Sequence, residues 1–130
     1  MLLNIFGYVS AILMINMKII NYQDVEAKRV EEGAKNMTIR WLITKEMGAE
    51  NFAMRYIEVN PGGSSPLHSH PWEHEIFILE GEGVMANGQE EKRITKGDFI
   101  FVPPNEAHQA RNTGQTTIRL LCMIPYTQTQ

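Results

Sequence analysis

The sequence predicts an all-β chain with a single domain, and two observations lead to this prediction. Short apolar runs rich in β-branched and aromatic residues recur from residue 38 onward, with glycine, proline or asparagine between them. No segment beyond residue 35 keeps a helical period of apolar residues over roughly ten positions. Short strands at this spacing are typical of an antiparallel sandwich or barrel.

The expected strands follow the apolar runs. They are Thr38–Thr44, Phe52–Val59, Glu75–Leu79, Gly83–Ala86, Phe99–Val102 and Thr116–Ile124. Between the runs at residues 83–86 and 99–102, Asn87-Gly88 is a strong signal for a two-residue hairpin turn. Residues 21–35 are polar and charged, which predicts an irregular lead-in or one short helical turn.

Composition limits the classes of protein to consider. The chain has 130 residues, of which 43% are hydrophobic, and this is enough for one core. The formal net charge is -3 with scattered acids and bases, and no DNA-binding helix motif is evident, so we expect no nucleic-acid partner. The single cysteine, Cys122, excludes an intramolecular disulfide and fits a reducing, cytoplasmic location.

Residues 1–16 form a hydrophobic N-terminal extension without a charged side chain. A transmembrane helix needs about 20 apolar residues, and this run is shorter and contains Asn4, Ser10 and Asn16. A secretory signal needs a basic start and a small-residue cleavage site, and neither is evident. Two interpretations remain. The segment is an extra ordered element, or the start of the protein has been assigned too far upstream and Met17 is the true initiator. We therefore expect a domain over residues 17–130 in the cytoplasm, with export or membrane attachment as the alternative.

The histidines are the residues that most clearly indicate a functional site. All four lie between residues 68 and 108, and three of them form the pattern HxHxxxH at His68, His70 and His74. Residues two apart on a strand share a face, so His68 and His70 can converge on one ion, and His108 arrives from a distant strand. An isolated histidine is more often a structural residue than a ligand, but this cluster in an all-β chain favours a metal site. A structural zinc site closed by four ligands is the alternative role of the cluster.

Two spaced motifs resemble those of the cupin superfamily. The motifs read Gly62-x5-His68-x-His70-x3-His74-x6-Gly81 and Gly97-x5-Pro103-x-Asn105-x2-His108-x3-Asn112. His74 stands where most members carry glutamate, and Asn105 replaces a usual glycine. The stretch from His68 to Glu75 resembles in particular the small manganese-binding single-domain cupins with an all-histidine site.

This resemblance implies a cupin jelly-roll β-barrel (double-stranded β-helix) as a single domain, with a motif core over about residues 38–125. It also implies one divalent transition metal per chain, manganese first and then iron, copper, nickel or zinc. The implied metal ligands are His68, His70, His74 and His108. A homodimer is expected from the same resemblance and from the run Glu75–Leu79, which is apolar on both faces.

Glu75 is a rival to His74 as the fourth ligand, because the first motif also tolerates the spacing that Glu75 would give. Two observations favour His74. The six-residue gap to Gly81 is kept only from His74, and His74 shares strand parity with Ile76 and Ile78. Glu75 then becomes an outer-sphere or surface partner.

Two further residues are candidates for the substrate pocket and thus for catalytic roles. Strand alternation places Arg55 on one face with Ala53 and Ile57, where its cation can hold a carboxylate or another anion. Its alternative role is a salt bridge with Glu58 or with a residue of a neighbouring strand. Cys122 is a candidate pocket thiol exposed to metal-activated oxygen, and its alternative role is that of a small buried apolar residue.

Four neutral imidazoles leave a divalent ion with its full charge and leave two positions of a six-coordinate ion open. We therefore expect a metal-dependent oxidoreductase, dioxygenase-like, that acts on a small organic substrate oriented by Arg55. One alternative is a Lewis-acid isomerase or lyase, for which Glu75 or a metal hydroxide would have to act as the base. The other is a non-catalytic module that binds a metal or a small ligand, because a fold alone does not choose among these classes.

Overall fold

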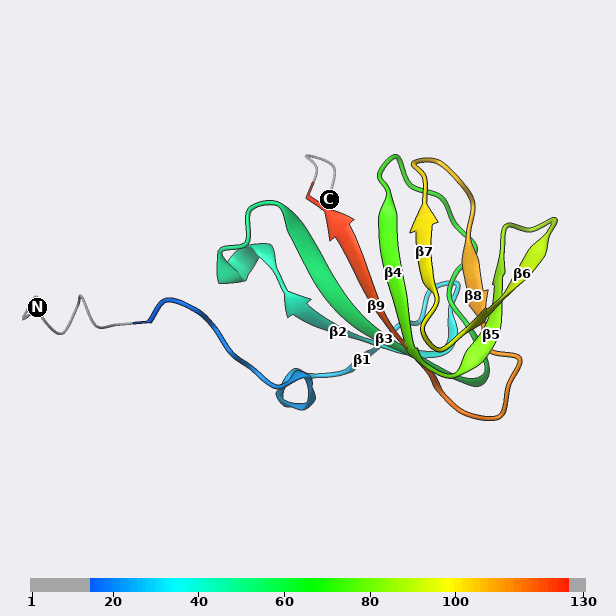
Figure 1. Ribbon diagram of the computed structural model, residues 1–130, viewed down its shortest axis with the longest axis horizontal. Coiled ribbons are helices and arrows are strands. Elements are labelled where there is room, and N and C mark those ends of the chain that lie inside the picture. The colour runs from blue at the N-terminus through cyan, green and yellow to red at the C-terminus, as the bar shows by residue number, and fades with distance from the viewer. Residues whose placement is uncertain (1–14, 127–130) are drawn as a thin grey trace, which may run out of the picture.

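The computed structural model describes residues 15–126, and most of the expected N-terminal extension, residues 1–14, lies outside this range. Nine strands and two short 3-10 helices make up the described part of the chain (Figure 1). The strands are β1 (Lys28–Arg29), β2 (Lys35–Ile43), β3 (Phe52–Ser64), β4 (His74–Glu80), β5 (Glu82–Ala86), β6 (Glu91–Thr95), β7 (Phe99–Val102), β8 (Gln109–Arg111) and β9 (Ile118–Pro125). The helices are η1 (Tyr22–Asp24) and η2 (Lys45–Met47). No helix within residues 15–126 has the length and apolar character needed to cross a membrane.

All the strand pairs are antiparallel, and together they form one strongly curled sheet. The strand order is β6-β5-β8-β3-β9-β4-β7, with β2 also paired to β3 and β1 to β2. The long strand β3 pairs with β9 over residues 52–59 and then with β8 at Ser64, so it links the two walls of a half-open barrel (Figure 1). The all-β single-domain prediction is therefore confirmed.

The core fills the inside of this curled sheet. Strand β9 alternates strictly, and its inward residues Ile118, Leu120, Cys122 and Ile124 are buried while the residues between them are half-buried. Successive side chains on a strand point to opposite faces, so this alternation assigns one face to the core. Ile78 on β4 and Val59 on β3 are fully buried against β9 in the same core cluster.

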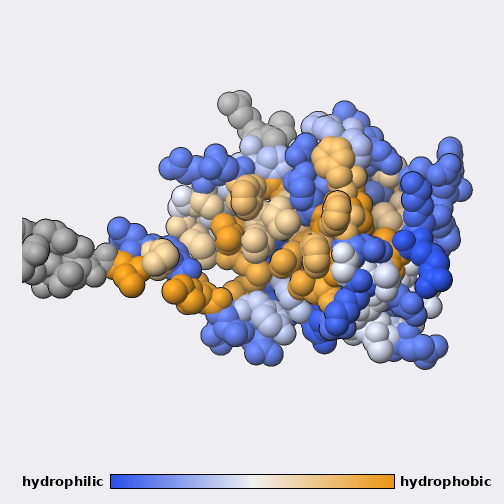
Figure 2. Space-filling view, in the orientation of Figure 1, coloured by the Kyte–Doolittle hydropathy of each residue, from blue (hydrophilic) through white to orange (hydrophobic). Residues whose placement is uncertain are grey.

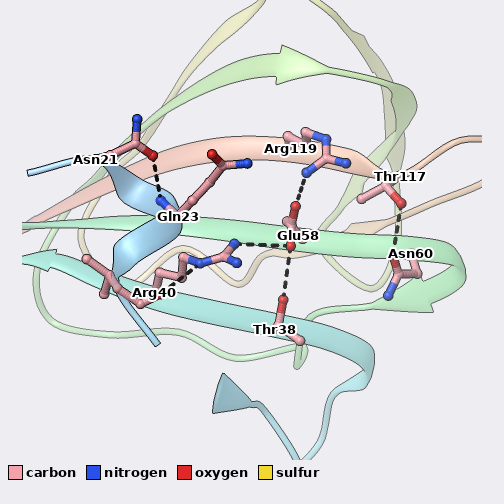
Figure 3. Close-up of polar contacts among 9 residues, drawn as sticks. Asn21, Gln23, Thr38, Arg40, Glu58, Asn60, Thr117 and Arg119 are labelled. Carbon is pink, nitrogen blue, oxygen red and sulfur yellow. Dashed lines mark hydrogen bonds and ion pairs between the residues drawn. The ribbon is translucent and has the colours of Figure 1, made fainter. Parts of the chain in front are cut away.

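The outer face of the larger wall carries one charged row and one apolar row. Glu58 on β3 accepts hydrogen bonds from Thr38 and Arg40 on β2 and pairs with Arg119 on β9 (Figure 3). A second row of directly paired residues consists of Tyr56, Leu121, Phe77 and Phe99. Figure 2 shows hydrophobic side chains gathered over the region where β3, β9, β4 and β7 run side by side.

Asn87 and Gly88 lie in a hairpin loop, as predicted, but they are not its two central residues. Beyond the last ladder pair, Ala86 and Glu91, the Asn87 backbone N–H donates to the Glu90 carbonyl at 3.1 Å, so Gly88 and Gln89 lie at the tip. The Asn87 side-chain oxygen accepts hydrogen bonds from the backbone N–H groups of Gln89 and Glu90, both at 2.8 Å. These side-chain bonds add to the backbone bond from Asn87 to Glu90 in closing the loop.

Besides the exposed two-residue strand β1, two strands do not follow an apolar run in the sequence. Strand β6 is polar except for its buried residue Ile94, and β8 has Ala110 as its buried residue. Both strands belong to the smaller wall, where one inward side chain per strand is enough to face the core. Their sequences therefore lack the alternation that marks the other strands.

Candidate metal centre

The four histidines come together at one end of the barrel interior. His68 and His108 face each other in an isolated antiparallel bridge, with backbone N–H to carbonyl distances of 3.2 and 2.9 Å. The His108 ring centroid lies 4.7 Å from that of His68 and 4.6 Å from that of His74. The His70 ring lies 4.2 Å from His68 and 5.0 Å from His74, so all four rings form one cluster.

The loops on each side of the histidines hold them in place. Asn105 donates its backbone N–H to the His70 carbonyl at 2.6 Å, which fastens the turn after Pro103-Pro104 to the loop that carries His70. Asn105 adopts a φ of 72°, in the left-handed region that asparagine tolerates better than most residues. The Trp72 ring stacks flat on the His70 ring, with centroids 4.7 Å apart. These contacts orient His70, which stands outside any strand.

Three of the four histidines bring their ligand nitrogen atoms close together, and His74 is not one of these three. Ligand atoms of His68, His70 and His108 all lie within 4.8 Å of one another. The Nε2 atoms of His74 and His108 are buried without a hydrogen-bond partner among the described residues. Their Nδ1 atoms are engaged, at 3.3 Å from the Cys122 Sγ and 2.9 Å from the Glu106 carbonyl oxygen, respectively. Buried polar atoms are rarely left unpaired, so this arrangement fits a transition-metal ion bound through Nε2.

Burial favours the neutral, metal-binding form of three of these imidazoles by lowering their pKa values. Burial lowers the pKa of His74 to about 3, with further lowering by the charges of His108, Arg55, His70 and His68. Burial likewise lowers the pKa of His68 to about 4 and lowers that of His70. Since a metal ion competes with protons for the same nitrogen atoms, a low pKa leaves the donor atoms free near neutral pH.

Glu75 lies on the opposite face of β4 from the buried His74. Its direct neighbours across the sheet are Phe101 on β7 and Met123 on β9, which both belong to the outer face. Burial raises the pKa of the Glu75 carboxyl, and a hydrogen bond to Glu73 and the charge of Glu73 raise it further. The arrangement therefore turns Glu75 away from the four imidazole rings.

Arg55 and Cys122 are direct neighbours on β3 and β9. The Arg55 Nη2 donates to the Cys122 Sγ at 2.8 Å, and the guanidinium carbon lies 5.5 Å from the centroid of the Trp41 ring. The Arg55 Nε is buried without a hydrogen-bond partner among the described residues. Burial raises the pKa of the Cys122 thiol, against an opposing effect of Arg55. The alternative of an Arg55–Glu58 salt bridge is not realised, because Glu58 pairs with Arg40 and Arg119.

A small interior cavity connects these groups. It has a volume of about 70 Å³, and its wall combines polar and aliphatic side chains. The lining residues are Met37, Arg55, Ile57, Val59, Ser65, Pro66, His68, His74, Ile76, Met85, His108, Ala110, Leu120 and Cys122. A larger groove of about 400 Å³ lies between β6 and β7, with His108 in its wall. The cavity, rather than the groove, brings three histidines, Arg55 and Cys122 together.

Some contributors to the site carry no signal in the sequence. Trp41 lies beneath Arg55 because β2 pairs with β3 in the register Trp41 to Arg55. The Glu106 contribution is a backbone carbonyl, which any residue type would supply. Both depend on tertiary geometry and not on residue pattern.

The matched family model confirms what the fold and the histidine cluster indicate. The model described as Cupin domain matches residues 55–124, which is more than half of the chain. The chain belongs to the cupin family. The match includes all four histidines together with Arg55 and Cys122.

Solved and curated cupin relatives cover the chain to different extents. The polyketide cyclase RemF from Streptomyces resistomycificus is 38% identical, with a TM-score of 0.78, over 84% of this chain and 79% of that one. The oxalate-binding protein of Thermotoga maritima is 39% identical over 69 residues, 52% of this chain and 57% of that protein. The 1-methylthio-D-xylulose 5-phosphate methylsulfurylase of Rhodospirillum rubrum is 34% identical over 71 residues, 55% of this chain and 46% of that protein. These matches span about half the length of the curated relatives.

Proposed function

We propose that this cupin is a metal-dependent oxidoreductase acting on a small organic substrate, with His68, His70, His74 and His108 as the metal ligands. The observation that carries the proposal is the pair of buried Nε2 atoms of His74 and His108, without hydrogen-bond partners among the described residues, within a cluster of four imidazoles. An all-imidazole donor set suits manganese, iron, copper, nickel and zinc, and we expect one ion per chain, manganese first. Such an ion, when bound, supplies Lewis acidity and, if redox-active, electron transfer.

Arg55 is the residue that we assign to substrate binding. Its guanidinium lies at the wall of the cavity that His68, His74 and His108 also line, and its buried Nε has a hydrogen atom to donate. A guanidinium recognises a carboxylate or an enolate oxygen through directed, charge-assisted hydrogen bonds. The cavity volume of about 70 Å³ favours a substrate, or a reacting part of a substrate, of only a few heavy atoms.

Oxidoreductase chemistry is favoured over isomerase or lyase chemistry by the groups in the cavity wall. Isomerases and lyases move protons and need a positioned base. No carboxylate lines the cavity among the described residues, and Glu75, the carboxylate considered for this role, lies on the other face of β4. Cys122 is the titratable group there besides the histidines and Arg55, and we assign it to holding Arg55 and His74 rather than to proton transfer.

A second candidate function is a non-redox ring closure supported by Lewis acidity. The likeness to the polyketide cyclase RemF favours it, because that likeness extends over most of both chains. The same four imidazoles and Arg55 would bind the substrate oxygen atoms in this case, and dioxygen would not be consumed. The choice between the two functions therefore depends on redox chemistry and not on the location of the site.

The experiment begins with metal analysis of protein purified without an affinity tag or chelator. One manganese, iron or copper ion per chain, together with oxygen uptake on addition of oxalate, a 1,3-diketone or catechol, would support the oxidoreductase. Zinc in the site, with ring closure of a poly-β-ketone under anaerobic conditions, would support the cyclase. Protein that neither contains nor binds a divalent transition ion would overturn both. Arg55→Met is the matched variant, and we expect it to weaken substrate binding while metal content stays near one ion per chain.

The proposal extends to location and assembly. A cytoplasmic location agrees with a single cysteine that is buried and free. A homodimer agrees with the exposed aromatic side chains of β7, since Phe99 is 82% exposed and Phe101 58% exposed. Large exposed apolar patches mark interaction surfaces.

A further inference from the structure

A second groove lies close to the histidine cavity, among residues of β1, β2, η2 and β9. It has a volume of about 480 Å³, and we call it the Trp41 groove. Its lining residues are Lys28, Trp41, Thr44, Lys45, Glu46, Ile124 and Tyr126. Ligand pockets in proteins typically have volumes of about 300–1,000 Å³. The Trp41 groove therefore has room for a ligand that the cavity of about 70 Å³ cannot hold.

Strand pairing places the Trp41 groove next to the cavity on the inner face of the sheet. Trp41 on β2 pairs directly with Arg55 on β3, and Arg55 lines the cavity. The guanidinium carbon of Arg55 lies 5.5 Å from the centroid of the Trp41 ring. On β9, Ile124 lines the groove and Cys122 lines the cavity, and both are buried on the same face of the strand. The contact between Arg55 and Trp41 is thus the boundary between the two spaces.

The groove offers aromatic surface to a ligand. Trp41 is 42% exposed although Arg55 also contacts its ring. Tyr126 is half-buried, and its hydroxyl group has no hydrogen-bond partner among the described residues. The Tyr126 backbone N–H donates to the Asn51 carbonyl at 3.1 Å, which fastens this end of the chain beside the start of β3. Since aromatic rings pack favourably on one another in offset or edge-on arrangements, these walls favour a planar aromatic ligand.

The groove is also positively charged. Lys28 on β1 pairs directly with Ile39, which packs against the core, so Lys28 lies on the inner side of its strand. No salt bridge within residues 15–126 involves Lys28 or Lys45. Glu46 is the one acidic residue in the described wall of the groove. Two ammonium groups and the nearby guanidinium of Arg55 outweigh this single carboxylate, so the charge of the groove favours an anion.

We propose that the Trp41 groove binds the part of the substrate that lies away from the metal, a planar aromatic group packed on Trp41 with an anionic substituent held by Lys28 and Lys45. This inference rests on the proposed function, because the reacting end of the same molecule occupies the cavity beside Arg55. An ammonium group acts as a point charge without the fixed geometry of a guanidinium, so the substituent is a carboxylate or a phenolate. The substrate class is therefore an aromatic anion with a second, oxygen-bearing reacting end.

Arg55 serves both parts of such a substrate. A guanidinium can stack on an aromatic ring and donate hydrogen bonds from its edge at the same time. Its stacking contact with Trp41 leaves the buried Nε, which has no partner among the described residues, to bind a substrate oxygen. Trp41 is thus a positioning residue for Arg55 as well as a wall of the groove.

The test is isothermal titration calorimetry of the full chain as purified, with 2-naphthoate as the probe. We expect binding, and a dissociation constant at least about tenfold higher for cyclohexanecarboxylate, which lacks the aromatic ring, and for naphthalene-2-methanol, which lacks the charge. Trp41→Leu, which keeps an apolar side chain in the wall, and Lys28→Glu/Lys45→Glu should each weaken 2-naphthoate binding to the same extent. Lys35→Glu, at an exposed position of β2 outside the groove, is the matched control and should bind like the wild type.

Three outcomes would overturn the assignment. They are absence of 2-naphthoate binding, equal binding of the three probes, and binding that is lost in Lys92→Glu but kept in the two groove variants. Lys92 lines the other groove, between β6 and β7, so the last outcome would place the ligand there. Unchanged far-ultraviolet circular dichroism would show that each variant remains folded.

Titration after chelator treatment separates this inference from the proposed function. None of the four histidines lines the Trp41 groove, so 2-naphthoate should still bind to the metal-free chain. If metal analysis overturned the proposed chemistry while 2-naphthoate binding kept its dependence on Trp41 and the lysines, the groove would stand as a site for aromatic anions. A metal-loaded, oxygen-consuming protein that does not bind 2-naphthoate would overturn the groove alone.

Discussion

The Nη2 atom of Arg55 donates a hydrogen bond to the Sγ atom of Cys122, at 2.8 Å, across the adjacent strands β3 and β9. The same sulfur lies 3.3 Å from the Nδ1 atom of His74. One thiol thus contacts both a proposed metal ligand and the proposed substrate-binding cation. If the Nδ1 atom carries the ring hydrogen and donates it to the sulfur, the other ring nitrogen, Nε2, is left free to bind the ion.

Cys122→Ala should therefore weaken metal binding, although Cys122 is not a proposed ligand. Loss of an outer-sphere partner typically costs about 10- to 100-fold in metal affinity, and we expect a loss in this range. Competition with a chelator of known affinity measures it. Cys122→Ser, which keeps an acceptor of similar size, is the control and should lie closer to the wild type. Wild-type affinity in the alanine variant would contradict this role of the sulfur.

His74→Ala and Glu75→Gln form a matched pair that tests the fourth ligand. His74 is buried among the other imidazoles, whereas Glu75 pairs with Phe101 and Met123 on the outer face. We expect His74→Ala to lose more than about 100-fold in metal affinity. That value is the upper end of the range for residues that contact a ligand without binding the ion. Glu75→Gln should keep one ion per chain in elemental analysis. The reverse pattern would transfer the ligand role to Glu75.

The metal-free protein should become less stable as the pH falls from about 6.5 to about 4. Burial lowers the pKa of His74 to about 3 and that of His68 to about 4, from an ordinary value of 6.5. The unfolded chain then binds more protons than the folded chain in this window, so the free energy of unfolding decreases with falling pH. Above about pH 7 these two rings are neutral in both the folded and the unfolded chain, so they no longer make the free energy of unfolding depend on pH.

Urea denaturation of chelator-treated protein at several pH values measures this slope. The double variant His68→Asn/His74→Asn removes both titrating rings and should flatten the curve between pH 6.5 and 4. Carboxylates that titrate near the acidic end are present in both proteins, so the difference between the two curves isolates the imidazoles. Parallel curves would mean that these rings titrate normally in the folded state.

The fold and the positions of the candidate ligands could be predicted from the sequence because their signals are local. Alternation along residues 118–124 marks a half-buried strand, and the spacing of His68, His70 and His74 places three imidazoles in one short stretch. Strand parity also turns Glu75 away from His74. Strand parity accounts for residues 118–124 and for Glu75, whereas His70 lies in a loop outside the strands and its place beside His68 does not follow from parity.

The contacts between the residues of the site could not be predicted, because they depend on the register between strands that are distant in the sequence. Arg55 and Cys122 meet only because β3 and β9 pair in one particular register, and a shift by one residue would separate them. The hairpin loop is shifted by one residue from the prediction, because Asn87 pairs with Glu90 through its backbone N–H and accepts the Glu90 N–H through its side chain. The exposed residues Phe77, Phe99 and Phe101 likewise come together only because β4 pairs with β7, which the sequence alone does not give.

Asn112 offers a test of the loop that connects β8 with β9. Its buried side chain donates to the carbonyl oxygens of Val59 and Thr116, both at 2.8 Å, and accepts the backbone N–H of Gly114 at 2.9 Å. Asn112→Ala leaves these groups without partners, at about 1–3 kcal/mol for a buried unsatisfied group. We expect a loss of about 2–4 kcal/mol in the free energy of unfolding, measured by urea denaturation.

The matched control for this last variant is Asn87→Ala. Asn87 also bonds two backbone N–H groups through its side chain, but it does so in an exposed loop where water replaces the lost bonds. A surface substitution of this type should cost about 1 kcal/mol or less. Equal losses in the two variants would show that burial of Asn112 adds nothing. A larger loss for Asn112 would locate part of the stability of the barrel in the link between β3 and the segment before β9.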